Sequence, residues 1–132
     1  MALGLLFEWY ARQLSARGPS DRAVGIFLPA AELFVELKQC YQNDASEAEV
    51  LQRYSKADLL LLDDLGAEKI SDWSRQIFYL IIDRRYREIR QTIITSNLSL
   101  GKISELVDDR IASRIAEMGE IIKIESEDRR LP

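Results

Sequence analysis

Two adjacent aspartates, Asp63 and Asp64, have the clearest capacity for chemistry in this sequence. They directly follow four leucines at residues 59–62, a composition typical of a strand that is buried on both faces. Two carboxylates at the rim of an apolar strand repel each other and lose hydration, and a divalent cation relieves both effects. Magnesium in nucleotide enzymes is commonly bound by one or two carboxylates plus phosphate oxygens. The doublet therefore predicts a Mg²⁺ site, with an acidic turn helped by Gly66 as the alternative.

A receiver domain also carries a phospho-accepting aspartate at an acidic strand end. Such a domain needs a second acidic cluster after its first strand, and this sequence shows none. The nucleotide-enzyme interpretation of the doublet is therefore favoured over a receiver domain.

Arg110 and Arg114 form a second candidate group. They are four residues apart and so share one face of a helix, where like charges destabilise by about 0.2–0.5 kcal/mol. An anionic partner would remove this repulsion. The alternative is a solvated helix face on which the arginines pair with Asp109 and Glu117.

Composition narrows the chemistry further. The chain has 132 residues, 47% of them hydrophobic and 30% charged, which suits one globular domain. Its net charge of −4 indicates no broad basic surface, so any contact with DNA is expected to be local or shared among subunits. There is no histidine, and Cys40 is the single cysteine. A histidine base, the usual zinc sites and an internal disulfide are therefore excluded.

Cellular location is predicted from the absence of sorting signals. The apolar residues 1–7 have no basic leader and are followed at once by Glu8, so they do not form a signal peptide. No apolar run approaches the roughly 20 residues of a membrane span. A reducing, cytoplasmic setting without membrane contact is expected.

Strands and helices are predicted to alternate along the chain. Short apolar or β-branched runs predict four strands, at residues 23–28, 59–62, 92–95 and 121–125. Apolar spacing and capping residues predict helices at residues 1–17, 30–41, 71–89, 99–107 and 108–118, with a further short helix capped by Ser46. This order predicts an α/β fold with a mostly parallel sheet and helices on both faces. The carboxyl end of each strand then lies where such sheets collect their chemistry.

The sequence resembles the DnaC/DnaI helicase loaders, which belong to the IstB-like ATP-binding proteins and to the AAA+ branch of the P-loop NTPases. The residues that carry the likeness are ADLLLLDDLG at 57–66, IIDRRY at 81–86, TIITSN at 92–97 and DRIASRI at 109–115. The first of these looks like a Walker B segment. The resemblance implies a three-layer sandwich and a single, partial AAA+ domain over residues 1–132.

The resemblance also implies roles at the acidic doublet. Asp63 would hold Mg²⁺, and Asp64 would contact the metal and polarise the attacking water. Asn97 would be the sensor-1 residue that orients this water. Phosphoryl transfer depends mainly on such positioning and on charge stabilisation.

Further roles fall on arginines. Arg114 matches the arginine finger that reaches the nucleotide of a neighbouring subunit, and such a finger can raise the rate by about 10³ to 10⁵. Arg110, on the same face, is a candidate nucleotide contact. Arg129 falls where the sensor-2 residue is expected.

The phosphate-binding loop of this family is not found in the sequence. No G-x-x-x-x-G-K-[ST] motif occurs, although this loop and its lysine hold the phosphates. The chain is expected to begin within the helix that follows the loop, so that the first strand and the loop are absent. We therefore expect this fragment to be unable to hydrolyse ATP alone.

The predicted function is that of an ATP- and Mg²⁺-dependent replicative-helicase loader acting in the initiation of DNA replication. Its expected partners are the replicative DNA helicase, further copies bound through the arginine-finger face, and single-stranded DNA. Two alternatives remain, an IstB-like transposition helper ATPase and a non-catalytic interaction module.

Overall fold

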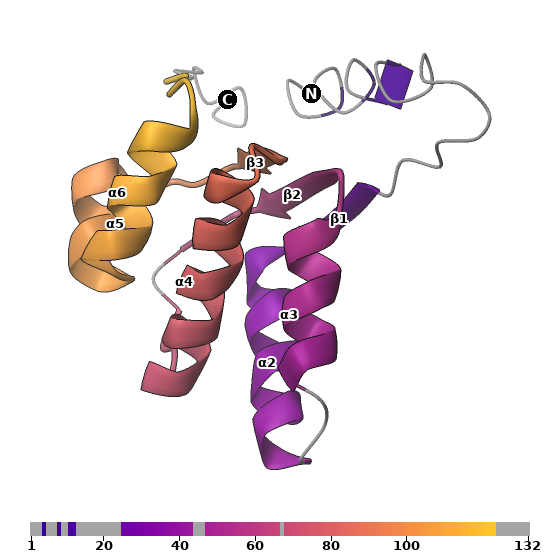
Figure 1. Ribbon diagram of the computed structural model, residues 1–132. Coiled ribbons are helices and arrows are strands. Elements are labelled where there is room, and N and C mark those ends of the chain that lie inside the picture. Colours follow the sequence, from indigo (N-terminus) through magenta and orange to yellow (C-terminus); the bar gives the residue numbers. More distant parts are fainter. Residues whose placement is uncertain are drawn as a thin grey trace, which may run out of the picture.

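The computed structural model describes residues 25–43, 47–66 and 68–123, together with Gly4, Glu8, Ala11 and Arg12. Strands and helices alternate as predicted, and the fold is α/β (Figure 1). The elements are β1 (Gly25–Pro29), α2 (Ala30–Gln42), α3 (Glu47–Lys56), β2 (Leu59–Asp63), α4 (Asp72–Arg87), β3 (Gln91–Ile94), α5 (Leu100–Leu106) and α6 (Asp109–Met118).

The three strands form one parallel sheet in the order β1-β2-β3. The central strand is β2, in which Leu59 pairs with Gly25 on one side and with Gln91 on the other. None of its four leucines exposes more than 2% of its surface. A strand covered on both faces needs such an unbroken apolar run, so the predicted burial of β2 is confirmed.

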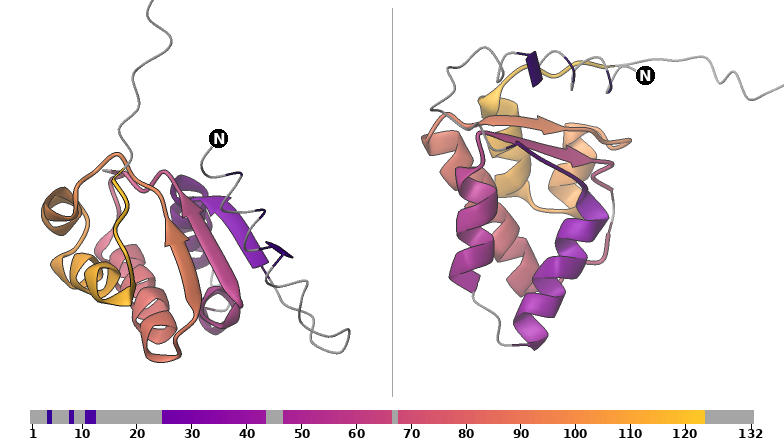
Figure 2. Two further views of the ribbon diagram at one scale, coloured as in Figure 1. Left: turned by 90° about the horizontal axis from the view of Figure 1, so that it is seen from above. Right: turned by 90° about the vertical axis from the view of Figure 1, so that its right-hand side faces the viewer.

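Helices α2, α3 and α4 lie side by side against one face of the sheet (Figures 1 and 2). Their contact is built from large side chains, including Phe34 of α2 and Phe78 of α4, whose rings meet edge to face at 5.2 Å. Leu33, Leu37 and Ile81 are fully buried in the same core. Burial of each such side chain contributes about 1.5–3 kcal/mol, so this layer holds the sheet in place.

Polar caps fix the starts of α4, α5 and α6, and the caps of α4, at Ser71 or Asp72, and of α5, at Ser99, were predicted. The hydroxyl of Ser71 accepts a hydrogen bond from the Ser74 N–H, and that of Ser99 accepts one from the Lys102 N–H. Asp108 accepts two backbone N–H groups at the start of α6. Each cap of this kind is worth about 1 kcal/mol. The cap predicted at Ser46 lies outside the described residues.

The end of α4 differs from the prediction, which placed it at Ile89. The helix ends at Arg87, because Ile89 has a left-handed backbone with φ of 54°. The Arg90 N–H then bonds to the Arg85 carbonyl at 2.9 Å and closes the helix end. The prediction thus extended the helix by two residues, but the Ile89 side chain is 90% exposed and does not pack as part of the helix.

The strand predicted at residues 121–125 is not supported by the part that the structure describes. Residues 121–123 are not in a strand, and 124–125 lie outside the described residues. Ile121 and Ile122 are 61% and 64% exposed, so their apolar character does not reflect burial in the sheet. Of the helix predicted at residues 1–17, only Gly4, Glu8, Ala11 and Arg12 are described, and they are helical.

Arg85 is a fully buried charged residue on α4. Its guanidinium donates to the carbonyl oxygens of Tyr54, Ala57 and Gln91 at 2.9, 2.7 and 2.6 Å, and to the Thr92 hydroxyl at 2.8 Å. Burial lowers the pKa of Arg85 to about 10, so the group stays protonated at neutral pH. This one side chain ties the end of α3 to the starts of β2 and β3. It was not singled out from the sequence.

Candidate nucleotide-binding site

The acidic doublet lies at the carboxyl end of β2. Asp63 is the last residue of the strand, and Asp64 follows with a left-handed φ of 57°. Aspartate tolerates this conformation better than most residues, because its short polar side chain can bond locally. The backbone thus turns out of the sheet at Asp64, whose side chain is exposed.

Thr95 joins the doublet to the neighbouring strand. Its hydroxyl accepts a hydrogen bond from the Asp64 N–H at 2.8 Å and donates one to Oδ1 of Asp63 at 2.6 Å. A hydroxyl carries a single proton, so the bond to Asp63 uses the only one that Thr95 has. The contact therefore orients the Asp63 carboxylate and fixes the turn at Asp64.

Backbone hydrogen bonds continue this junction past the end of β3. The Thr95 N–H donates to the Leu62 carbonyl at 3.0 Å, and the Leu65 N–H donates to the Thr95 carbonyl at 2.8 Å. The Ser96 hydroxyl donates to the Leu65 carbonyl. Asn97 comes next and is exposed. The structure thus brings Asp63, Asp64 and Asn97 to the same edge of the sheet.

The donor set at this edge fits magnesium only in combination with other ligands. Among the described residues there is no group of three or more His, Cys, Asp or Glu side chains that could hold a metal. Mg²⁺ commonly uses one or two carboxylates and completes its shell with water and phosphate oxygens. Asp63 and Asp64 match such a partial site. Of their four carboxylate oxygens, only Oδ1 of Asp63 accepts a hydrogen bond from another described residue, so the other three can face a metal ion.

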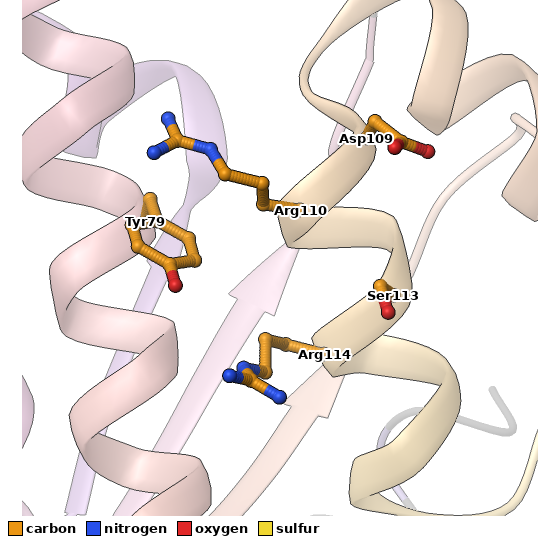
Figure 3. A pocket seen from close by; sticks show the side chains of 5 residues that line it. All are labelled: Tyr79, Asp109, Arg110, Ser113 and Arg114. Carbon is orange, nitrogen blue, oxygen red and sulfur yellow. The ribbon is translucent and has the colours of Figure 1, made fainter.

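The arginines lie elsewhere, on α6 facing α4. Arg110 and Arg114 project toward α4 on either side of Tyr79 (Figure 3). With Asp109 and Ser113 they line a depression of about 230 Å³. Within the described part of the chain the structure does not bring either arginine to the acidic doublet.

Arg110 is paired within its own chain. Its guanidinium lies 4.3 Å from the centre of the Tyr79 ring, and Nη2 donates to Asp108 at 3.1 Å and to Gln76 at 3.2 Å. Burial raises the pKa of Asp108, but hydrogen bonds from Arg110 and from the Ile111 N–H outweigh it and leave the pKa below its ordinary value. Asp108 therefore remains a carboxylate and both caps α6 and holds Arg110.

Arg114 is paired with a buried and an exposed carboxylate. Its Nε donates to Oδ1 of Asp83 at 3.0 Å and its Nη1 to Glu117 at 3.2 Å, while the guanidinium lies 4.6 Å from the centre of the Tyr86 ring. Asp83 is buried and also pairs with Arg87 at 3.0 Å.

The alternative prediction was that Asp109 and Glu117 pair with the two arginines on the helix face. It is correct for Glu117, which pairs with Arg114, and wrong for Asp109. Asp109 instead accepts a hydrogen bond from Ser104 at 2.7 Å. Asp83 and Asp108 of the same chain supply anions to the two arginines, so the spacing of Arg110 and Arg114 alone does not require an outside anion.

Two residues of these sites were not assigned roles from the sequence. Thr95 and Asp83 lie within the quoted runs TIITSN and IIDRRY, yet each acts through a partner 31 or 32 residues away in the chain. No local spacing signals such a contact. Arg129, the sensor-2 candidate, lies outside the described residues.

None of the described helices is long and apolar enough to cross a membrane.

Comparison with known proteins gives consistent matches. The sequence profile of the family described as IstB-like ATP binding protein matches residues 17–132. The replicative helicase loader DnaC of Escherichia coli K12 is 26% identical over 91 residues, which are 68% of this chain and 37% of the loader. An insertion-sequence (IS232) protein of Bacillus thuringiensis subsp. berliner, named for ATP binding, is 28% identical over 108 residues, which are 81% of this chain and 42% of that protein.

A solved structure supports the same relationship. The crystal structure of the DnaC helicase loader superimposes with a TM-score of 0.62 at 32% identity, over 73% of this chain and 58% of that one. The matched part of the chain spans less than half the length of the two curated relatives named above.

Proposed function

Since the chain belongs to the IstB-like ATP binding protein family, we propose that it forms the Walker B and sensor-1 part of the ATPase core of a replicative helicase loader. The observation that carries this proposal is the hydroxyl of Thr95, which joins Asp63 on β2 to the segment after β3 that contains Asn97. An ordinary acidic turn does not need its carboxylate oriented by the neighbouring strand.

The roles at this edge follow from its chemistry. Asp63, with one oxygen held by Thr95, keeps its second oxygen available for Mg²⁺. Bound there, the ion would neutralise charge on the phosphate groups of ATP. Asp64, exposed beside it, is the group that polarises the attacking water, and Asn97 orients this water. These are the positioning and electrostatic tasks on which phosphoryl transfer depends.

The groups that bind the phosphates of ATP, here called the phosphate cradle, are not provided by a phosphate-binding loop in these 132 residues. The 132 residues contain no G-x-x-x-x-G-K-[ST] sequence, whose backbone N–H groups and lysine bind the phosphates. We therefore infer that these residues alone do not hydrolyse ATP.

Arg114 is proposed as the arginine finger, which acts on nucleotide held by a second subunit. Its position on α6, away from the acidic doublet of its own chain, supports action in trans. Arg110 lines the same depression and is proposed as an additional nucleotide contact. Self-association through this face and contact with single-stranded DNA belong to the same proposal, as does action in the cytoplasm during replication initiation.

A transposition helper ATPase is the second candidate. The IS232 protein matches 81% of this chain, compared with 68% for DnaC of E. coli. The ATPase chemistry would be the same, and the partner would be a transposase in place of a helicase.

Two measurements test the proposal. Affinity capture on immobilised replicative helicase and on immobilised transposase, both from the host, distinguishes the two candidates. Retention by the helicase alone is expected, and retention by the transposase alone would overturn the loader assignment.

Calorimetric titration with ATP and excess Mg²⁺ tests the missing cradle. No binding in the micromolar range is expected for the 132 residues. Micromolar binding would contradict the inference that they lack the cradle. A non-catalytic module would give a different pair of results. Neither partner would retain the chain, and a protein that also carries a phosphate-binding loop would still neither bind nor hydrolyse ATP.

A further inference from the structure

The guanidinium of Arg114 is held along two different edges. Its Nε edge bonds to Asp83, whose side chain is 8% exposed, and its Nη1 bonds to Glu117, whose side chain is 47% exposed. The face of the guanidinium lies on the Tyr86 ring. One arginine thus has a buried anchor and a surface partner.

The anchor at Asp83 is difficult to release. Oδ1 of Asp83 accepts from Arg114, and Oδ2 pairs with Nε of Arg87 at 3.0 Å. A buried carboxylate that loses one of its cationic partners is left poorly solvated, so separating the pair costs much more than it would in water. We expect the bond between Asp83 and Arg114 to persist in every state of the subunit.

The contact with Glu117 is of the opposite kind. Glu117 lies three residues after Arg114 on the same helix and is half exposed. Exposed pairs at this spacing contribute little free energy and are screened by salt. A stronger acceptor can therefore replace Glu117 without disturbing the fold.

The space next to Arg114 suits such an acceptor. The depression of about 230 Å³ is lined by Arg114 and also by Arg110 and the Ser113 side chain. Asp109 lines it as well, although its Oδ1 is engaged by Ser104. A phosphate group would gain charge-assisted hydrogen bonds from the terminal nitrogens of a guanidinium that is already oriented.

We propose that Asp83 is the positioning residue of Arg114, and that Glu117 occupies, in the isolated subunit, the guanidinium edge that a phosphate group of a neighbouring subunit's nucleotide takes on assembly. Asp83 thus fixes the orientation of the Arg114 guanidinium, and Glu117 occupies the Nη1 position until a phosphate group replaces it, which we call masking. The identity of the incoming phosphate rests on the arginine-finger role proposed above. The division of labour between the two carboxylates rests on the contacts within this chain.

The test uses the full chain with ¹⁵N-labelled arginine and inorganic tripolyphosphate as the probe. NMR follows the Nε–H and Nη signals of Arg114 during titration. On saturation we expect the Nη signals to shift while the Nε–H keeps its slow exchange with solvent, because Asp83 still holds it. An Nε–H of Arg114 that exchanges as fast as that of the exposed Arg84 would overturn the anchor role without any variant.

Glu117→Gln tests the mask. Removing one negative charge a few ångströms from the binding edge should tighten tripolyphosphate binding at Arg114 about fivefold at low salt. Glu105→Gln is the matched control, because Glu105 is also exposed and pairs with a cation on its own helix, Lys102. Equal affinities for the two variants would refute the masking role.

Asp83→Asn tests the anchor directly. The variant should accelerate exchange of the Arg114 Nε–H and weaken tripolyphosphate binding, while the backbone amide spectrum reports whether the fold is kept. An unchanged exchange rate in a folded variant would refute the positioning role. If the variant unfolds, the exchange rates of the Arg114 and Arg84 Nε–H groups in the unmodified protein still test whether Asp83 holds Arg114.

Failure of this inference can be separated from failure of the proposed function. If Glu117→Gln and Asp83→Asn behave as expected but Arg114→Ala does not affect turnover by the assembled ATPase, the contacts are as inferred and the finger role is wrong. If Arg114→Ala abolishes turnover and Glu117→Gln binds no better than Glu105→Gln, the finger role stands and the mask is refuted.

Discussion

Oγ1 of Thr95 lies 2.6 Å from Oδ1 of Asp63, across the boundary between the ends of β3 and β2. The same hydroxyl accepts the Asp64 N–H at 2.8 Å. One side chain just past the end of the neighbouring strand thereby fixes both members of the acidic doublet. The catalytic geometry proposed for this edge depends on that contact as much as on the carboxylates.

Replacing Thr95 tests this dependence. Thr95→Val keeps the shape of the side chain but removes both the acceptor of the Asp64 N–H and the donor to Asp63, so the free energy of unfolding should fall by about 0.5–1.5 kcal/mol. Thr95→Ser restores the hydroxyl and should recover most of the loss. Urea denaturation measures both. Equal stabilities for Val and Ser would show that the hydroxyl contributes nothing.

Replacing Asp64 tests the proposed chemistry. In the ATPase completed by its phosphate-binding loop, Asp64→Asn should keep nucleotide binding and lose hydrolysis, because the amide cannot polarise the attacking water. Asparagine also tolerates the left-handed φ of 57°, so the fold should not suffer. Steady-state phosphate release measures the effect.

Asp72→Asn is the control for this experiment, because the Asp72 side chain is 99% exposed at the start of α4. Its turnover should match that of the unmodified ATPase. If Asp64→Asn retains wild-type turnover, the role of Asp64 has been assigned wrongly.

Replacing Arg85 tests the buried anchor of the sheet. Arg85→Met fills a similar volume but removes the donor to four backbone carbonyls and to the Thr92 hydroxyl, so we expect a loss of about 3–5 kcal/mol in the free energy of unfolding. Arg84→Met, on the exposed side of the same helix, should change it by less than about 0.5 kcal/mol. Similar losses for the two variants would mean that the hydrogen bonds of Arg85 contribute nothing beyond general helix effects.

The features that the sequence predicted well are those with a local signal. Four leucines in a row indicate a strand buried on both faces, and Ser71 and Ser99 are typical capping residues. The edge of the sheet shared by Asp63 and Asn97 followed from the rule that parallel strands end on one side.

The features that the sequence did not reveal depend on contacts between distant parts of the chain. Asp83 and Arg85 stand in a run of charges that reads as a solvated helix face, yet both are buried. What buries them is the packing of α4 against α6 and against the starts of β2 and β3. Periodicity within one helix cannot report which neighbour will supply a partner.

Tyr86 provides a prediction about pH. A hydrogen bond to Glu117, and then the charge of that carboxylate, raise the pKa of Tyr86 above its ordinary value of about 10. The folded state therefore holds the phenol proton more tightly than the unfolded state does. The stabilisation is fully present below the unfolded pKa and is lost as the pH rises through the folded one.

Absorbance of the phenolate measures this effect, with Tyr86→Phe subtracted to isolate one tyrosine. Glu117→Gln should move the midpoint of Tyr86 down toward 10, because both the acceptor and the negative charge are weakened. A midpoint that does not change in this variant would show that Glu117 does not contact Tyr86 in solution.

Ile89 combines two unfavourable properties at the end of α4. Its φ of 54° is a conformation that costs a residue with a Cβ about 1–2 kcal/mol, and its side chain is 90% exposed, so burial does not offset this cost. Glycine is the usual residue at this position of a helix end, because it adopts the left-handed region freely.

Ile89→Gly should therefore raise the free energy of unfolding by up to about 1 kcal/mol, after allowing for the greater backbone entropy that glycine loses on folding. For a domain of this size the melting temperature should rise by about 4 °C. Ile89→Ala is the matched control, because it removes the exposed apolar surface and keeps a Cβ at the same φ. It should recover little of the gain. If alanine stabilises the protein as much as glycine does, the benefit comes from removing the apolar side chain, and the left-handed backbone at the end of α4 is not the source of the strain.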